Sequence, residues 1–157
     1  MLRGVFDASA CIGNRVAFAA PSEGVTPVSD PVVLVVEDNP IIRMGALDLV
    51  SVAGFEGIGA EGADQAIAIL EARASIRVVF TDIEMPGTID GLKLAHYIRE
   101  RWPPIQLIVA SGRAILEESQ LPAGSRFFSK PYDDNAIVQE ITRMLVASDP
   151  TGSVQKS

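Results

Sequence analysis

The sequence has too little cysteine, histidine and positive charge for several classes of protein. Its single cysteine, Cys11, cannot form an intramolecular disulfide, and with one histidine, His96, no Cys/His spacing indicates structural zinc. Twenty acidic residues outnumber 13 lysines and arginines, giving a net charge of −7. This charge argues against nucleic acid as the main partner, because nucleic-acid binders present a basic surface. The same charge would suit a divalent cation.

The sequence also has no apolar run near the roughly 18 residues that would cross a bilayer. Residues 17–20 superficially resemble a signal-peptide cleavage site, but Asp7, Asn14 and Arg15 interrupt any hydrophobic region before it. We therefore expect a cytoplasmic protein without a membrane partner.

The domain organisation is predicted from length and composition. The 157 residues suffice for one domain with a full core, and a content of 48% hydrophobic and 21% charged residues is typical of a globular protein. Residues 1–30 lack sustained periodicity and predict a flexible leader, whereas residues 31–147 predict the folded domain. Residues 148–157 predict a polar tail, so we expect no output domain after the folded one.

Short apolar runs alternate with helical patterns along the folded part. Strands are predicted at 32–36, 55–60, 78–82, 105–110 and 126–129. Helices are predicted at 40–53, 63–73, 91–102 and from 134 to about 147, the first with Ile42, Ala46, Leu49 and Ala53 facing the core. Between 113 and 124 the pattern is poor, so the fourth helix should be short or irregular. This alternation predicts a doubly wound α/β fold with a five-stranded parallel sheet.

Polar side chains stand where the strands end. Glu37 and Asp38 follow the first strand, Asp82 ends the third, Ser111 follows the fourth and Lys130 the fifth. Parallel strands joined by helices point the same way, so all five residues should lie along one edge of the sheet. Three carboxylates there would repel one another unless a cation such as Mg²⁺ neutralised them, and an ammonium and a hydroxyl suit a phosphate group.

Taken alone, three of these residues have a simpler interpretation. Asp82 could merely cap the turn at Pro86-Gly87, Lys130 could be a surface lysine and Ser111 a turn residue. The occurrence of all of them in order at strand ends favours a site.

Together with Met85-Pro86-Gly87 and Pro131, this set resembles the receiver domain of two-component response regulators, over about residues 31–147. The resemblance implies the flavodoxin-like, CheY-like fold of that family, with strand order 2-1-3-4-5, and a single-domain regulator. It also implies that Asp82 accepts a phosphoryl group from a sensor histidine kinase or a histidine phosphotransfer protein, with Mg²⁺ as cofactor. The downstream protein target is not indicated.

The resemblance further implies a role for each matching residue. Asp38 would bind the metal ion directly, Glu37 through water, and Glu84 through its backbone carbonyl, with Asp82 as a further ligand. Lys130 and the Ser111 hydroxyl would each bind a phosphoryl oxygen. Phe127 falls where the family keeps an aromatic side chain that swings inward on activation, so Ser111 and Phe127 would form the switch.

Three neighbouring features carry expectations of their own. In receiver domains, the side chains at the positions of Glu84 and Arg113 border the phosphoryl group and influence its lifetime, and here their opposite charges could pair. The peptide bond at the position of Lys130-Pro131 is commonly cis in this family. His96 lies outside the inward positions of its helix and is expected to be a solvated surface residue.

Two other functions are compatible with a strand-end aspartate. A small hydrolase or phosphatase with an aspartate nucleophile would need an acid or base near Asp82, but we expect the turn to carry Glu84 outward. A flavodoxin-like cofactor binder would need a glycine- or hydroxyl-rich phosphate loop after the first strand, where this chain has Glu37 and Asp38. We therefore expect a regulator that only catalyses its own phosphotransfer and dephosphorylation, and not an enzyme with a separate substrate.

Overall fold

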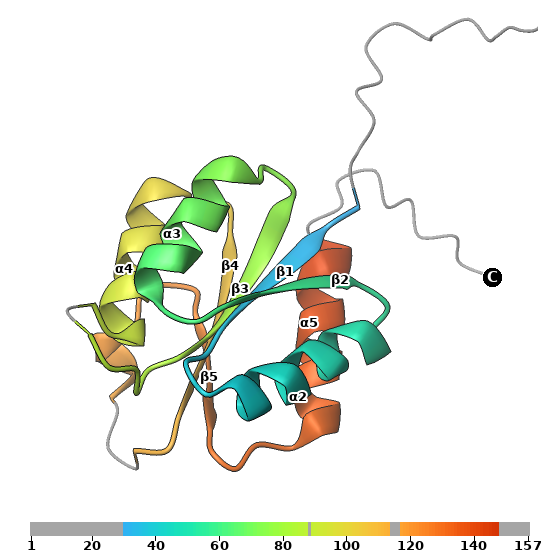
Figure 1. The fold of residues 1–157 in the computed structure, drawn as a ribbon. Helices are drawn as coiled ribbons and strands as arrows, with labels where there is room; N and C mark the ends of the chain where they lie inside the picture. Colours follow the sequence, from blue (N-terminus) through green and yellow to red (C-terminus); the bar gives the residue numbers. More distant parts are fainter. Residues whose placement is uncertain (1–29, 88, 114–116, 148–157) are drawn as a thin grey trace, which may run out of the picture.

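A five-stranded parallel sheet forms the centre of the protein in a computed structural model, which describes residues 30–87, 89–113 and 117–147 (Figure 1). The strands are arranged in the order β2-β1-β3-β4-β5, as the resemblance implied. Apart from residue 30, the expected leader and the expected tail lie outside the described residues, as does Cys11.

The three central strands are the continuous apolar runs of the sequence. They are β1 (Val32–Val36), β3 (Ile76–Asp82) and β4 (Gln106–Ser111), and nearly all their side chains are buried. Both faces of these strands are covered, so β-branched and aliphatic residues are favoured at every position. The edges are β2 (Glu56–Ala60), with its two glycines, and the short β5 (Arg126–Ser129).

In the part of the chain that the structure describes, four α-helices cover the two faces of the sheet, in agreement with the predicted doubly wound architecture. Helices α3 (Ala63–Ala72) and α4 (Gly91–Arg101) lie on one face, and α2 (Pro40–Val52) and α5 (Asp134–Ala147) lie on the other (Figure 1). Alternate residues of β3 show the division, because Val79 belongs to the core under α3 and α4 and Phe80 to the core under α2 and α5.

Helix α2 begins as the sequence predicted, but its first turn is oriented differently. The Asn39 side chain caps it by accepting hydrogen bonds from the backbone N–H groups of Ile41 and Ile42, with Pro40 in the first turn. Ala46 is buried, as expected. The prediction that Ile42 faces the core is wrong, because the residue is 42% exposed. The first turn of α2 follows the end of β1, where Ile42 borders a surface hollow with Lys130 and Tyr132 instead.

The expected irregular fourth helix is a single 3₁₀ turn among the described residues, η3 (Glu118–Gln120). Residues 114–116 of this region lie outside the description.

The ring of His96 on α4 lies close to this turn, with its Nε2 atom 2.7 Å from the backbone carbonyl oxygen of Gln120. His96 is exposed, as predicted, but its ring also connects α4 to η3.

Glycine allows α4 to begin directly against the end of β3. A Cβ atom added to Gly91 would lie 1.8 Å from the backbone oxygen of Asp82 and 2.8 Å from the Cα of Ile83. The Gly91 N–H also donates to the carbonyl of Ile83 at 3.1 Å. No other residue type fits this contact without moving the backbone, so Gly91 helps to fix the position of Asp82.

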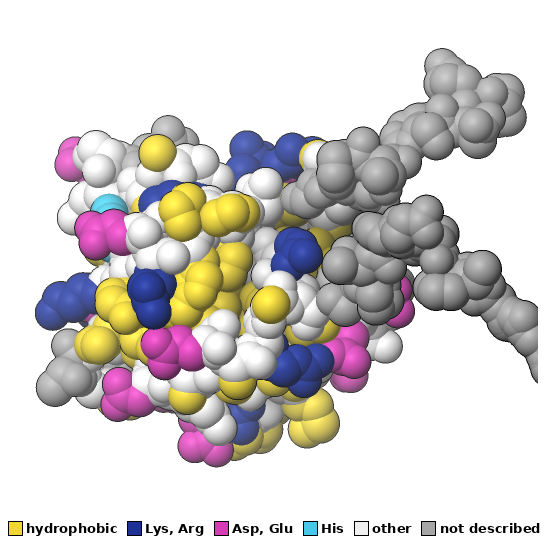
Figure 2. All heavy atoms as spheres, turned by 90° about the horizontal axis from the view of Figure 1, so that it is seen from above, with side chains coloured by type: hydrophobic (Ala, Val, Ile, Leu, Met, Phe, Trp, Pro, Cys, Tyr) yellow, Lys and Arg dark blue, Asp and Glu magenta, His cyan; other side chains and the backbone are white. Residues whose placement is uncertain are grey.

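The edge of the sheet where the strands begin carries a surface different from that at the strand ends. A hollow of about 530 Å³ is lined there by apolar residues such as Leu70, Ile76 and Trp102 and by the charged residues Glu71, Arg73 and Arg77. Figure 2 looks down on this edge and shows apolar side chains gathered between basic and acidic ones.

Within the described ranges, no helix combines the length and the apolar character that crossing a membrane requires.

Candidate functional site

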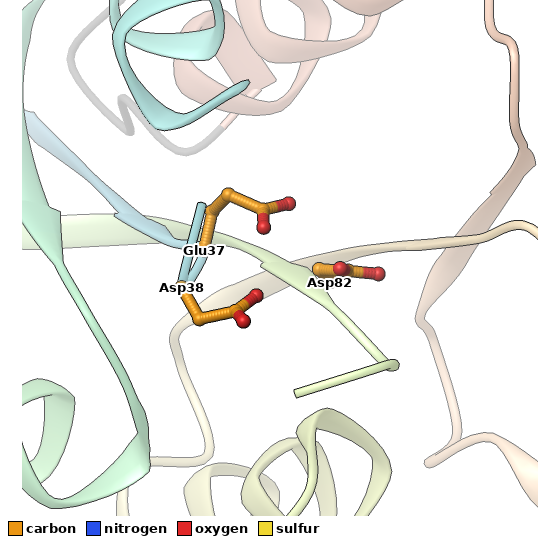
Figure 3. A group of neighbouring side chains, drawn as sticks. All are labelled: Glu37, Asp38 and Asp82. Carbon is orange, nitrogen blue, oxygen red and sulfur yellow. The ribbon is translucent and has the colours of Figure 1, made fainter. Parts of the chain in front are cut away.

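Three carboxylates meet at the carboxyl edge of the sheet. Glu37 and Asp38 follow β1 directly, and Asp82 is the last residue of the neighbouring strand β3. One carboxylate oxygen from each of the three lies within 4.8 Å of the others (Figure 3). Glu37 and Asp82 are buried, whereas Asp38 is exposed. The register of β1 on β3 therefore brings together the three acids that the sequence grouped by strand ends.

Lys130 reaches this group from the end of β5. Its Nζ lies 3.1 Å from an oxygen of Asp82 and 3.4 Å from one of Glu37. The backbone N–H of Lys130 donates to the carbonyl of Ser111 at 2.8 Å, which ties the lysine to the end of β4. The Lys130-Pro131 peptide bond is cis, as expected.

Burial and charge act in opposite directions on these groups. Desolvation raises the pKa of Asp82 above its ordinary value although the ammonium of Lys130 lowers it. The pKa of Glu37 is also raised, first by burial and further by the charge of Asp82. Burial lowers the pKa of Lys130, but its hydrogen bond and charge interaction with Asp82 outweigh this effect and raise it overall.

Two residues that the sequence did not single out hold Glu37 in place. The backbone N–H of Asn39 donates to a carboxylate oxygen of Glu37 at 3.0 Å, and the Arg43 guanidinium donates to the Glu37 backbone carbonyl at 2.7 Å. Asn39 is also the cap of helix α2. Arg43 lies one turn into α2, and no pattern in the sequence indicates its contact.

Ser111 is fully buried at the end of β4 and bonds to Glu84. Its hydroxyl donates to Glu84 Oε2, and the backbone N–H of Gly112 donates to Glu84 Oε1 at 3.1 Å. Arg113 Nε lies 3.7 Å from Glu84 Oε2, so the expected pairing of their charges is present. The expectation that the turn carries Glu84 outward is wrong: the side chain is only 31% exposed and rests on the end of β4.

These contacts also affect the ionisation of Glu84. Desolvation raises the pKa of its carboxyl, but the hydrogen bonds from Ser111 and Gly112 outweigh this and lower the pKa below its ordinary value. Glu84 is therefore a carboxylate with its oxygens occupied by donors.

Phe127 and Tyr132, two of the aromatic residues in and near β5, lie in different places. Phe127, in β5, is half-buried and borders a hollow that runs along residues 121–127. Tyr132, which the sequence did not single out, packs its ring 5.7 Å from that of Phe80, and burial raises its pKa. The one signal in the sequence that could have indicated Tyr132 is its position directly after Lys130-Pro131.

The donor set fits a hard divalent cation. Three carboxylates converge, and Lys130 offsets only one of their negative charges. Magnesium is bound in proteins through one or two carboxylates together with water and phosphate oxygens, which is the environment that Asp38, Asp82 and Glu37 can provide. The arrangement can also bind an anion, because Lys130 and Ser111 carry the donors that a phosphoryl group requires.

Comparison with known proteins agrees with this geometry. A family model described as the response regulator receiver domain matches residues 33–142. The chain belongs to the family of response regulator receiver domains, which confirms the resemblance seen in the sequence. Domains of this family act in two-component phosphorelay signalling, are phosphorylated by histidine kinases or phosphotransfer proteins, and typically bind Mg²⁺ at an acidic pocket.

The curated relatives include regulators and sensor kinases. The chain is 31% identical over 123 residues to the response regulator protein FleR of Pseudomonas aeruginosa, covering 75% of this chain and 25% of that protein. It is 30% identical over 129 residues to the sensor histidine kinase RcsC of Escherichia coli, covering 80% of this chain and 13% of that protein. The chain thus spans a quarter or less of the length of these two relatives.

Solved structures show the same fold. A response regulator receiver protein from Sinorhizobium medicae is 26% identical, with a TM-score of 0.71, covering 78% of this chain and 99% of that one. A receiver protein from Pseudomonas putida is 28% identical, with a TM-score of 0.66, covering 73% of this chain and 98% of that one. The five-stranded fold and its strand order are therefore confirmed.

Proposed function

We propose that this protein accepts a phosphoryl group on Asp82 in a Mg²⁺-dependent reaction and that the acceptance changes its contacts with other proteins. The observation that carries the proposal is the position of Asp82. Its carboxylate ends the central strand β3 beside Glu37 and Asp38, and one of its oxygens lies 3.1 Å from Lys130 Nζ. The nucleophile is thus next to acids that can hold a cation and next to an ammonium that can bind a phosphoryl oxygen, as phosphoryl transfer requires.

The roles of the residues follow from their chemistry. A carboxylate oxygen of Asp82 attacks the phosphorus atom of a phosphohistidine, the P–N bond breaks, and the imidazole leaves with the electron pair. Asp38 and Asp82 would bind Mg²⁺ directly, with Glu37 acting through water and Glu84 through its backbone carbonyl. When bound there, the ion would supply positive charge to offset the negative charges of the carboxylates and the phosphoryl oxygens. Lys130 pairs with one phosphoryl oxygen, and Ser111 donates to another.

The surface beside Lys130 suits a protein as the phosphoryl donor. Ile42, Pro131 and Tyr132 line a hollow of about 420 Å³ next to the ammonium. On the adjoining helix, Ile41 and Met44 are 75% and 59% exposed. Apolar side chains gathered around a reactive group are typical of a contact surface, here for a sensor histidine kinase or a histidine phosphotransfer protein.

Two further parts of the proposal concern the phosphorylated protein. The phosphoryl group would draw Ser111 and Phe127 into a second arrangement, which a downstream protein partner recognises. Its loss would be self-catalysed hydrolysis at Asp82. This fits the site better than a dedicated phosphatase, because the nearby Glu84 has its carboxylate oxygens engaged by Ser111 and Gly112.

The test is a reaction of the full chain with acetyl phosphate in the presence and absence of Mg²⁺, followed by intact mass measurement. One phosphate adduct should form with Mg²⁺ and be lost with chelator. Asp82→Asn should abolish it, whereas Asp48→Asn, at an exposed position of α2, should leave it unchanged. The proposal fails if no Mg²⁺-dependent adduct forms or if Asp82→Asn still acquires one.

A further inference from the structure

Glu84 binds several donors at the end of β4 at once. Its carboxylate accepts hydrogen bonds from the Ser111 hydroxyl and the Gly112 N–H, and it pairs with the Arg113 side chain. The Arg113 backbone N–H in turn donates to Ser111 Oγ at 3.0 Å. The orientation of the hydroxyl is thus set from both sides, since its oxygen accepts from Arg113 while its hydrogen points to Glu84.

A serine hydroxyl carries one hydrogen and can donate one full hydrogen bond. The proposed function requires that hydrogen for an oxygen of the phosphoryl group on Asp82, and the inference drawn here rests on that function. We propose that Glu84 is a positioning residue that competes with the phosphoryl group for the Ser111 hydroxyl and so sets how readily the phosphorylated protein adopts its switched arrangement.

The location of Glu84 makes this competition direct. Its backbone N–H donates to Asp82 Oδ1 at 3.2 Å, so the residue adjoins the acceptor carboxylate. A phosphoryl group added there brings negative charge close to the Glu84 carboxylate and disfavours its present position. Arg113, whose side chain is 73% exposed, provides a partner that can follow Glu84 toward solvent. The same event therefore attracts the hydroxyl and repels the group that holds it.

An electrostatic effect of Glu84 on any bound anion has to be separated from this mechanism. Removing a nearby negative charge strengthens anion binding whether or not Ser111 is present. Competition for the hydroxyl requires Ser111. A double-mutant cycle between Glu84→Ala and Ser111→Ala distinguishes the two effects, because only the competition makes the changes non-additive.

The experiment titrates beryllium fluoride, a mimic of the phosphoryl group, into the full chain at saturating Mg²⁺. Binding is followed by the ¹H–¹⁵N NMR signal of Gly112, whose N–H donates to Glu84 in the starting state. The variants are Glu84→Ala, Glu84→Gln, Ser111→Ala and the double variant Glu84→Ala/Ser111→Ala. Glu61→Ala, at an exposed acidic position of the same sheet edge, controls for the loss of charge alone.

We expect Glu84→Ala to bind the mimic about tenfold more tightly than the unmodified protein, the factor expected for release of one hydrogen bond to a charged group. The affinity of Glu84→Gln for the mimic should lie between those of the unmodified protein and Glu84→Ala, because glutamine keeps one oxygen that can accept from the Ser111 hydroxyl. In the Ser111→Ala background the effect of Glu84→Ala should fall below about twofold. An equal gain in both backgrounds, or an equal gain for Glu61→Ala, overturns the inference. If the unmodified protein shows no Mg²⁺-dependent binding, the proposed function itself fails.

Discussion

Asp82 is a buried acid whose surroundings oppose its ionisation more than they favour it. It is 6% exposed and lies within reach of two other carboxylates, and Lys130 only partly compensates. A group whose pKa is raised by folding contributes stability below its unfolded pKa, near 3.8, and loses it as the pH rises through the folded pKa. At neutral pH the ionised Asp82 therefore destabilises the fold and leaves the site suited to a cation.

The first prediction at the residue scale follows from the raised pKa of Asp82 and the resulting loss of stability at neutral pH. Asp82→Asn should raise the melting temperature at pH 7 without Mg²⁺ by about 2–4 °C, the change that 1 kcal/mol typically produces in a chain of 150–250 residues. The difference should shrink below pH 4, where Asp82 is protonated in the unmodified protein. Differential scanning calorimetry at both pH values measures it.

Magnesium provides the control for that prediction. Mg²⁺ should stabilise the unmodified protein with increasing concentration and should stabilise Asp82→Asn much less, because ligand binding to the folded state alone raises its stability. If Asp82→Asn is less stable than the unmodified protein at pH 7 in the presence of chelator, Asp82 is not an unfavourably buried charge.

At the scale of elements, the contact between α4 and β3 predicts a strong effect of a single methyl group. Gly91→Ala should destabilise the protein by about 3 kcal/mol or more, because its Cβ would overlap backbone atoms of Asp82 that cannot move independently. Gly45→Ala is the matched control. Nothing lies within 4 Å of a Cβ at this exposed position inside α2, so the change should stabilise by about 0.5–1 kcal/mol. Urea unfolding measures both values.

The Gly91 variant also tests how the site is built. Since the overlap is with Asp82 itself, Gly91→Ala protein that remains folded should form the phosphate adduct more slowly than Gly45→Ala protein. Equal stability of the two alanine variants would show that α4 does not pack on β3 as described.

A second prediction at this scale concerns the connection between β5 and α5. Glu140 in α5 is buried, accepts hydrogen bonds from the Arg143 side chain and lies 3.1 Å from Arg126 Nε at the start of β5. The hydrogen bond from Arg143, with the charges of both arginines, lowers the Glu140 pKa below its ordinary value of 4.5 despite burial. A group whose pKa is lowered by folding contributes stability above its unfolded pKa and loses it as the pH falls through the folded pKa.

Glu140→Gln should therefore destabilise the protein at pH 7 by about 1.5–3 kcal/mol, the usual range for hydrogen bonds to a charged group. As the pH falls below about 4.5, the two proteins should approach equal stability, because Glu140 loses its charge in the unmodified protein as well. Chemical unfolding at a series of pH values measures the difference. A deficit that stayed constant down to pH 3 would mean that packing and not charge explains it.

At the scale of the whole molecule, the described residues between 30 and 147 form a hydrophobic core on each face of the sheet. We predict that a fragment of residues 30–147 folds cooperatively, with a melting temperature within about 2 °C of the full chain and an unchanged rate of Mg²⁺-dependent adduct formation. A fragment that aggregates or melts well below the full chain would show that the expected leader or tail contributes to the fold.

The succession of strands and helices along the chain, and the edge that holds the site, could be predicted from local patterns, whereas the strand order was implied only by the family resemblance. Apolar runs such as residues 32–36 and 78–82 are long enough for buried strands, and helices between them make the strands parallel. Parallel strands place their carboxyl ends together, so Glu37, Asp38 and Asp82 had to share an edge whatever the details of packing.

The sequence by itself therefore determined the class of fold, the edge that holds the acids and the lysine, and the family to which the chain belongs. The tertiary structure alone decided how the side chains pair: Glu84 binds Ser111 across 27 residues, Lys130 reaches Glu37 across 93, and Ile42 lies at the surface. The physical reason is that strand patterns depend on each residue's own neighbours in sequence. Contacts between loops depend instead on strand register and backbone turns, which no local pattern specifies.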